Sequence, residues 1–167
     1  MSHREHHAAA PTRIRCYVVT VSDTRTEETD TGGRLLRQLL TNDSHSVLGH
    51  AIVPDDADTL RRALERQLGT EAVQAVITTG GTGISRRDGS YEVISQLLDK
   101  RLDGFGELFR ALSFEEIGPS AMLSRACAGT ARGKILISLP GSQNAVRLGM
   151  TRLVLPELGH LVREVTR

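Results

Sequence analysis

Aromatic residues are scarce in this chain of 167 residues. They make up 3% of the sequence, and tryptophan is absent. Because proteins that bind single-stranded nucleic acid stack bases on aromatic side chains, this scarcity argues against such a platform. The formal net charge is only +1, so the chain also lacks a broad basic field for a polyanion. We therefore expect no nucleic-acid partner, and a small anionic ligand held by a few local charges fits better.

Long apolar runs are missing as well. No stretch approaches the roughly 18 to 20 apolar residues that span a bilayer, and the N-terminus has no apolar segment of the signal-peptide kind. Cysteine is limited to Cys16 and Cys127, far apart and in apolar surroundings, a pattern typical of buried free thiols in a reducing compartment. These absences predict a cytoplasmic protein with no membrane attachment.

The remaining composition is that of an ordinary globular chain. Hydrophobic residues account for 39% and charged residues for 25%, as in typical soluble domains, and the length suits one domain with a substantial core. Residues 1–12 are polar and broken by Pro11, so we interpret them as a disordered N-terminal tail and residues 13–167 as a single domain. We assign no function to the histidines of the tail, His3, His6 and His7.

The most informative stretch of the sequence is residues 75–88. An apolar β-type run leads into Gly80, Gly81 and Gly83, and two arginines and Asp88 follow. Glycine lets a backbone adopt positive φ and approach a ligand closely, and N–H groups at the start of a following helix attract anions. The stretch predicts a strand, an anion-binding loop and a helix. The alternative is a turn that needs glycine for its geometry alone.

The spacing within this loop excludes two familiar nucleotide motifs. A Walker A loop ends in Gly-Lys-Ser/Thr, and nothing of that kind follows Gly83. A dinucleotide-binding fingerprint needs a third glycine at the position of Arg86. Ser90 is a candidate N-cap for the next helix, and Glu92 falls in its first turn, where an acid suits the helix dipole. A phosphate-binding loop of a different type remains.

Strand and helix patterns alternate along most of the chain. Apolar, β-branched runs predict strands over residues 13–22, 47–53, 72–78 and 134–139. Helical periodicity follows each of them, over residues 31–40, 58–68, 91–98 and 144–165, with Asp58 as a candidate cap for the second helix. This alternation predicts a mainly parallel sheet covered by helices on both faces.

Three features of the C-terminal half are less regular. Ser113 to Glu116 match a capping box, which indicates a helix start. Residues 120–128, which include Cys127, have the pattern of a short helix. Pro156 should break or kink the last helix near Leu155, unless it begins a new helix.

Polar residues or glycine follow each of the four predicted strands. In an open parallel sheet, ligands bind beyond the carboxyl ends of the strands, so these loops should meet at one edge. They are Ser22-Asp23, Pro54-Asp55-Asp56, residues 79–88 and Pro140-Gly141-Ser142. Their convergence favours ligand binding over a purely geometric role for the glycine loop.

The predicted site is rich in acids and poor in nucleophiles. Neither cysteine lies at the predicted edge and no histidine lies near the glycine loop, so Ser–His or Cys–His chemistry has little support. Asp55 and Asp88 come from separate loops, and two carboxylates beside a phosphate-binding loop suit Mg²⁺. Phosphoryl or nucleotidyl transfer at such a site needs mainly positioning and charge neutralisation.

Several motifs, in this order, resemble the MoaB/Mog family of molybdenum cofactor biosynthesis proteins. The glycine loop is the first of them, and the resemblance runs from about Pro11 to the C-terminal helix. The chain is more similar to the MoaB branch, because it is short and carries residues 113–118. The motifs are Thr79-Gly80-Gly81-Thr82-Gly83 with Arg87-Asp88, then Gly104-Phe105-Gly106-Glu107-Leu108-Phe109-Arg110, Leu112-Ser113, Leu123-Ser124-Arg125, Gly129 and Pro140-Gly141-Ser142.

The resemblance implies a molybdopterin-binding domain with a three-layer α/β/α sandwich, assembled as a homotrimer or hexamer. Active family members adenylylate molybdopterin with ATP and Mg²⁺ and release pyrophosphate. The two functional acids of the family fall here on Asp55 and Asp88, which would act as catalytic residues and hold Mg²⁺. The alternative is a non-catalytic molybdopterin-binding or scaffold protein of the same pathway. Other proteins of that pathway are candidate partners.

The resemblance also implies which residues bind the two substrates. The glycines would supply a backbone cradle, and Ser142 with its loop would meet the phosphate or dithiolene end of the pterin. Arg87 and Arg125 are candidates for anion contacts, with structural salt bridges as the alternative. The predicted binding set is Ser22, Thr79, Gly80, Gly81, Thr82, Gly83, Arg87, Ser124, Arg125, Pro140, Gly141 and Ser142.

One departure from the family pattern follows Asp88. The family commonly has a β-branched residue, threonine and proline before glutamate, whereas this chain has Gly89-Ser90-Tyr91-Glu92. Serine keeps a hydroxyl for capping. Gly89, however, should loosen the backbone that holds the acid.

Overall fold

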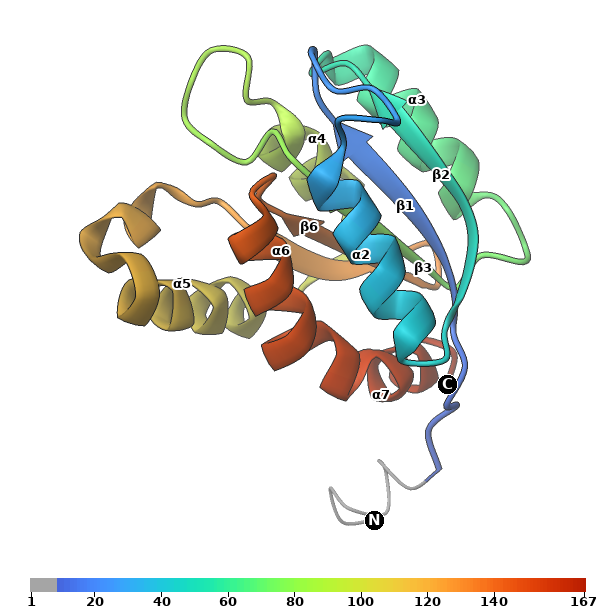
Figure 1. Cartoon of the computed structure of the whole chain (residues 1–167). Coiled ribbons are helices and arrows are strands. Elements are labelled where there is room, and N and C mark those ends of the chain that lie inside the picture. The colour runs from blue at the N-terminus through green and yellow to red at the C-terminus, as the bar shows by residue number, and fades with distance from the viewer. Residues whose placement is uncertain (1–8) are drawn as a thin grey trace.

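A six-stranded sheet runs through the middle of the molecule (Figure 1). The computed structural model describes residues 9–167, so the predictions for the first eight residues, His3, His6 and His7 included, lie outside the described part. The strand order is β2-β1-β3-β6-β5-β4. The strands are β1 (Arg15–Val21), β2 (Ser46–Val53), β3 (Ala75–Thr79), β4 (Lys100–Arg101), β5 (Cys127–Ala131) and β6 (Lys134–Leu139).

The four predicted strands form the parallel part of the sheet. β1 pairs in parallel with β2 and with β3, and β3 pairs in parallel with β6. Both faces of β3 and β6, and most of β1, are buried, which is why their sequences are nearly continuous apolar runs, whereas the edge strand β2 is half-exposed. The predicted parallel core is confirmed.

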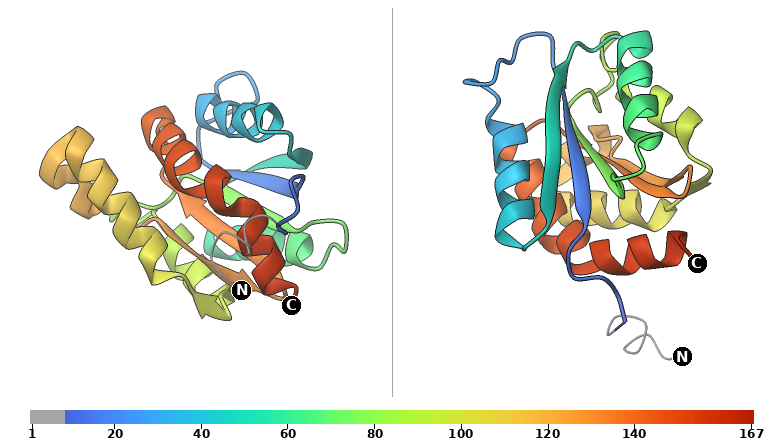
Figure 2. Two further views of the ribbon diagram at one scale, coloured as in Figure 1. Left: turned by 90° about the horizontal axis from the view of Figure 1, so that it is seen from below. Right: turned by 90° about the vertical axis from the view of Figure 1, so that its right-hand side faces the viewer.

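Helices cover both faces of the sheet, and the right-hand panel of Figure 2 shows α2 on one side and α3 on the other. Side chains alternate between the faces, so Val18 and Ile77 enter one core cluster and Val19 and Val76 enter the other. The first cluster lies under α2 (Thr31–Asn42), α5 (Asp103–Ile117), α6 (Gln143–Gly149) and α7 (Leu155–Val165). The second lies under α3 (Ala57–Leu68) and α4 (Ser90–Leu97). This is the expected three-layer α/β/α sandwich.

The helix predicted over residues 120–128 is wrong. Gly118–Leu123 form a short 3-10 helix, η1, and Cys127 begins β5, which runs antiparallel to β6. Residues Arg132 and Gly133, which join β5 to β6, both have positive φ, as in the tight turns of β-hairpins. A Cβ on Gly129 would lie 2.1 Å from the Lys100 carbonyl oxygen, so a residue without a side chain permits the pairing with β4.

Three predicted helix boundaries also need correction. Asp56, not Asp58, caps α3, and its carboxylate accepts a hydrogen bond of 2.9 Å from the Thr59 amide. Gly89 occupies the cap position of α4, and Ser90 is the first helical residue. Ser113 begins no helix, because α5 continues through it and buries its side chain.

The C-terminal helical segment is continuous but not uniform. A π-helical turn, η2 (Met150–Val154), separates α6 from α7, and Pro156 lies in the first turn of α7. The backbone angles of Val154 and Leu155 are helical, so the π-helical turn leads into the proline without a break, and such turns are a common irregularity of helices. The predicted irregularity near Leu155 is therefore observed as this π-helical turn, and Pro156 is the second residue of α7 rather than its first.

The predicted state of the two thiols is confirmed. Cys16 and Cys127 are both buried and free of disulfide bonds, and burial raises the pKa of the Cys16 thiol to about 12. Within residues 9–167, no helix combines the length and the apolar character that crossing a membrane requires.

The end of β3 approaches β1 too closely for any residue except glycine. Gly80 has φ of +101° and Gly81 has φ of +67°, both in the region that disfavours side chains. A Cβ on Gly80 would lie 2.2 Å from the Val21 carbonyl oxygen. The Gly80 amide donates to the Leu139 carbonyl at 2.9 Å, so this glycine joins the ends of three neighbouring strands.

We expect Gly80→Ala to lower the free energy of unfolding by more than about 1 kcal/mol, because it adds left-handed strain and a steric contact. Gly104→Ala is the matched control. A Cβ there meets nothing within 4 Å and the backbone is helical, so that change should be neutral or stabilising by up to about 1 kcal/mol. Chemical denaturation measures both, and equal stability of Gly80→Ala and the wild type would contradict the required conformation.

Candidate functional site

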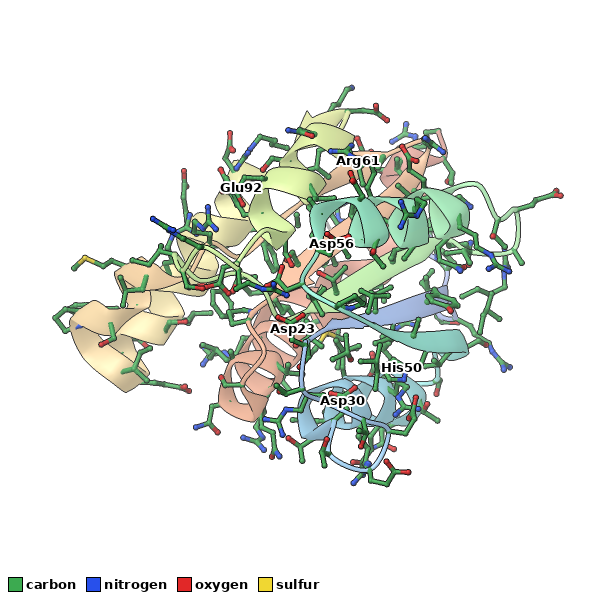
Figure 3. The ribbon with its side chains drawn as sticks, turned by 90° about the horizontal axis from the view of Figure 1, so that it is seen from above. Asp23, Asp30, His50, Asp56, Arg61 and Glu92 are labelled. Atoms are coloured by element: carbon green, nitrogen blue, oxygen red, sulfur yellow. The ribbon has the colours of Figure 1, made fainter. Side chains whose placement is uncertain are left out.

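The four polar loops meet at the carboxyl edge of the parallel strands, as predicted. Figure 3 looks down on this edge, with Asp23 between Asp56 at the start of α3 and Asp30 at the start of α2. Hydrogen bonds join neighbouring loops, since the Asp55 amide donates to the Asp23 carboxylate at 3.1 Å and the Thr79 hydroxyl donates to the Pro140 carbonyl at 2.9 Å. The loops therefore form one connected surface.

A cavity of about 360 Å³ opens between the loops that follow β1 and β3. The chain leaves β1 toward α2 on one face and leaves β3 toward α4 on the other face, so the two loops diverge. Such a point of divergence is where open α/β sheets bind ligands. The wall consists of Thr20, Val21, Ser22, Arg25, Asp30, Thr79, Gly80, Gly141 and Ser142.

The Asp88 side chain folds back onto the glycine loop. Its Oδ2 accepts hydrogen bonds from the Ser85 amide at 2.9 Å and from the Ser85 hydroxyl at 2.6 Å. A Cβ on Gly83 would lie 2.7 Å from the same oxygen. The hydrogen bond from the Ser85 side chain lowers the pKa of Asp88, with help from the Ser85 and Gly83 amides. Asp88 is therefore ionised at neutral pH.

Asp55 reaches the glycine loop from the end of β2. Its Oδ1 accepts a hydrogen bond of 3.2 Å from the Gly89 amide, and a Cβ on Gly81 would lie 3.1 Å from its Oδ2. Burial raises the pKa of Asp55, and the negative charges of Asp88 and Asp23 raise it further. The two predicted acids are thus brought to the same loop, where each carboxylate disfavours the charge of the other.

This mutual repulsion fits a divalent cation, because Mg²⁺ would relieve it and commonly uses one or two carboxylates plus substrate phosphate oxygens. The part of the chain that the structure describes holds no group of three or more His, Cys, Asp and Glu residues placed to bind a metal by themselves. Asp55 and Asp88 could therefore hold Mg²⁺ together with a phosphate ligand, but not as a closed protein site.

The two predicted anion-binding arginines both form structural contacts. Arg87 pairs with Asp23 at 2.7 Å. Arg125 pairs with Glu92 and donates to the carbonyl oxygens of Gly83, at 2.9 Å, and Asp88, at 3.0 Å. Both side chains thus form salt bridges, Arg125 also holds the glycine loop in place, and a role in anion binding stays a prediction for both.

Hydrogen bonds from two other segments contact the backbone around Gly89. Its φ is −112°, which any residue adopts, and its amide is bonded to Asp55. Arg125 holds the carbonyl on the other side of this segment and also donates its own amide to Thr82 at 3.1 Å. Contacts from distant segments therefore hold this backbone on both sides of Gly89, and the expected loosening stays a prediction.

The predicted serines lie in two different places. Ser142 caps α6 by accepting from the Ala145 amide at 3.1 Å, and Ser22 accepts from the Arg25 amide at 3.0 Å, so both border the cavity near Gly80. Ser124 lies elsewhere, in a second cavity of about 450 Å³ on the far side of Arg125.

One network that was not predicted fixes the wall of the first cavity. Asp30 caps α2 through the Gly33 amide at 2.9 Å, and its Oδ2 also accepts from the Thr20 hydroxyl at 2.6 Å. His50 of β2 lies 3.2 Å from that carboxylate and, through its other ring nitrogen, 3.1 Å from Glu27. The N-cap position of Asp30 before a leucine-rich helix was a usable signal. The pairing of Asp30 with His50 joins segments far apart in the sequence, so no local sequence signal predicted it.

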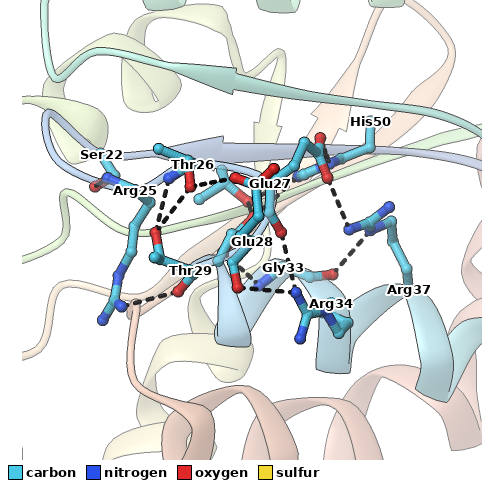
Figure 4. A network of polar contacts seen from close by, with 12 residues as sticks. Ser22, Arg25, Thr26, Glu27, Glu28, Thr29, Gly33, Arg34, Arg37 and His50 are labelled. Atoms are coloured by element: carbon cyan, nitrogen blue, oxygen red, sulfur yellow. Dashed lines mark hydrogen bonds and ion pairs between the residues drawn. The ribbon is translucent and has the colours of Figure 1, made fainter.

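Hydrogen bonds also hold the loop over residues 22–30 in its conformation (Figure 4). The Thr26 amide donates to the Thr29 hydroxyl at 2.8 Å, and Arg34 donates to the Glu27 and Glu28 carbonyls at 3.0 Å each. Arg25 donates to the Thr29 carbonyl at 2.9 Å and lines the cavity. The loop therefore presents a guanidinium group to any ligand that enters.

Fold and site together define a class of protein: an α/β domain with a glycine loop and paired acids at the switch point of a parallel sheet. The family described as "Probable molybdopterin binding domain" matches residues 17–160. The chain therefore belongs to this molybdopterin-binding family, on the MoaB-like side of the MoaB/Mog proteins.

Several relatives are similar over nearly their whole length. "Molybdenum cofactor biosynthesis protein B" of Bacillus cereus is 52% identical over 168 residues, covering 100% of this chain and 99% of the relative. A crystal structure of a molybdenum cofactor biosynthesis protein B has a TM-score of 0.90 at 52% identity, covering 93% of this chain and 98% of the other. The tungsten cofactor synthesizing protein MoaB from Pyrococcus furiosus has a TM-score of 0.85 at 38% identity, covering 95% and 100%.

The opposed environments of the two acids give a prediction for carbon-13 NMR. The pKa of the Asp55 carboxyl should lie above the ordinary value for aspartate, because it is partly buried and near the charge of Asp88. Asp88→Asn should lower the pKa of Asp55, since it removes a neighbouring negative charge. Asp58→Asn, on the exposed first turn of α3, should leave it unchanged. An Asp55 pKa that stays constant or rises in Asp88→Asn would contradict the proximity.

Proposed function

We propose that this MoaB-like molybdenum cofactor biosynthesis protein binds molybdopterin and adenylylates it with ATP and Mg²⁺. The observation that supports the proposal most is the meeting of Asp55 and Asp88 at the glycine loop, beside a cavity at the switch point of the sheet. Adenylyl transfer needs positioned phosphates and neutralised charge rather than a protein nucleophile, and the site offers those elements.

The reaction would exchange one phosphoanhydride bond for another. A phosphate oxygen of molybdopterin attacks the α-phosphorus of ATP, the bond from that phosphorus to the bridging oxygen breaks, and pyrophosphate leaves. Mg²⁺ held by Asp55 and Asp88 would neutralise the phosphate charge when bound.

The residues of the chain would position the two substrates. Gly80 and Gly81, at positive φ, let the backbone approach a phosphate without a side chain between them. Arg25 and the Ser142 loop would hold the phosphate or dithiolene end of the pterin in the 360 Å³ cavity. Arg125 would keep the loop in shape through the carbonyl oxygens of Gly83 and Asp88.

We also propose a cytoplasmic homotrimer or hexamer, with other proteins of the pathway as partners. Exposed apolar side chains on α5 and η1 support assembly, because surfaces of this kind mark interaction sites. Analytical ultracentrifugation should show a trimer or hexamer, and a monomer at micromolar concentration would contradict the proposal. The exposed side chains are Leu108, Phe114, Ile117, Met122 and Leu123.

One observation favours the alternative, a non-catalytic molybdopterin-binding or scaffold protein. The Asp88 carboxylate is satisfied by Ser85 inside its own loop, as a purely structural residue would be. Incubation with molybdopterin, ATP and Mg²⁺ decides between the two. The catalytic proposal requires pyrophosphate and adenylylated pterin in equal amounts, whereas pterin binding without either product would support the alternative.

Asp88→Asn should lower the rate of the chemical step by more than about tenfold, or about 1.4 kcal/mol of barrier, while substrate binding changes less. Asparagine keeps the shape and an acceptor for Ser85 but loses the charge that would orient the metal. Asp58→Asn, which removes an exposed acid from α3, should leave turnover within about twofold. Single-turnover kinetics on both variants separate binding from chemistry, and turnover of Asp88→Asn within tenfold of the wild type would refute the role of Asp88.

A further inference from the structure

A second cavity, of about 450 Å³, is bordered by α4, α5 and the start of β5. Its wall carries three arginines from three different segments: Arg101 of β4, Arg110 of α5 and Arg125 of the loop before β5. Tyr91 and Cys127 also line it. Apart from Arg125 and the neighbouring Ser124, this cavity has no part in the predicted site.

The three guanidinium groups converge. The guanidinium carbons of Arg101 and Arg125 lie 5.4 and 5.1 Å from the centre of the Tyr91 ring. All three arginines lie close enough to the Cys127 thiol for their charges to lower its pKa, although burial has the larger effect and the pKa is raised. One small space thus receives positive charge from three directions.

Carboxylates lie beside this charge, because Asp103 and Glu107 also line the cavity. Arg101 pairs with Asp103 at 3.3 Å and Arg125 pairs with Glu92. Among residues 9–167, Arg110 forms no ion pair, and its hydrogen bonds go to two carbonyl oxygens, of Ser124 at 3.4 Å and of Ala126 at 3.3 Å. Its charge-assisted donors therefore make only long contacts and remain suited to an anion.

Glycine shapes the pocket around Arg110. A Cβ on Gly106, one helical turn earlier, would lie 2.7 Å from the Nη2 atom of Arg110 and 2.9 Å from the Ala126 carbonyl oxygen. The missing side chain lets the guanidinium lie against its own helix and next to β5. The orientation of Arg110 is therefore built into the fold rather than left to a mobile surface side chain.

Arg125 connects this cavity with the glycine loop, because it lines the cavity and also binds the carbonyl oxygens of Gly83 and Asp88. The acids Asp55 and Asp88 on the loop side would repel further phosphate charge. Guanidinium groups, in contrast, match phosphate oxygens in geometry and charge. A polyphosphate extending from the loop would therefore pass from the acids to the arginines.

We infer that the three-arginine cavity binds a pyrophosphate group, either as released product or as the terminal phosphates of a nucleoside triphosphate. The inference deepens the proposed adenylyl transfer and rests on it for the source of the pyrophosphate. The binding itself is measurable without turnover.

Isothermal titration calorimetry of the full chain with inorganic pyrophosphate tests the inference. Arg110→Gln should weaken pyrophosphate binding by at least about tenfold, since one charge-assisted contact is lost. Gly106→Ala should also weaken it, because it displaces the Arg110 guanidinium without removing charge. Arg66→Gln removes the same charge from the exposed last turn of α3 and should leave the affinity within about twofold.

Competing ligands identify the source of the bound group. Displacement of pyrophosphate by ATP but not by AMP would place the terminal phosphates of the nucleotide in the cavity, and no displacement by either would assign it to released product. Equal competition by citrate, equal affinity of Arg110→Gln and the wild type, or no binding at millimolar pyrophosphate would overturn the inference. Pyrophosphate binding through Arg110 in a protein without adenylyl transfer would refute the proposed function and leave the cavity assignment standing.

Discussion

The close approach of β1 and β3 at their carboxyl ends is the constraint on which the rest of the site depends. Only glycine fits at position 80, because the backbone there has positive φ and faces the Val21 carbonyl oxygen. That approach places the glycine loop beside the loops of β1 and β6 and opens the cavity between them. The position of Asp88, which folds back onto the same loop, follows from it.

Electrostatic balance is the second theme of the site. The glycine loop holds two acids near one another, and the arginines nearest to them serve the fold: Arg87 pairs with Asp23, and Arg125 holds loop carbonyls. The positively charged side chains that line the two cavities are instead Arg25, on one side of the glycine loop, and Arg110, on the other. A separation of acidic and basic groups suits a substrate that carries several phosphates and a metal ion.

Local signals explain how much of this could be predicted from the sequence. The apolar run before Gly80 and the polar residues after each parallel strand predicted the sheet and placed Asp55 beside Asp88. β5 escaped prediction because its small residues form a strand only by pairing with β6 and β4. The capping-box pattern at Ser113 misled because α5 continues past it, and the contacts of Arg125 join segments about 40 residues apart.

In the proposed function, the phosphate groups of the substrates bind against the glycine loop. A crystal structure of the chain with molybdopterin, or with a non-hydrolysable ATP analogue and Mg²⁺, tests it most directly. We expect phosphate oxygens in contact with the backbone of residues 80–83 and a metal ion between them and the carboxylates of Asp55 and Asp88. Phosphate bound away from this loop, with both carboxylates uninvolved, would contradict it.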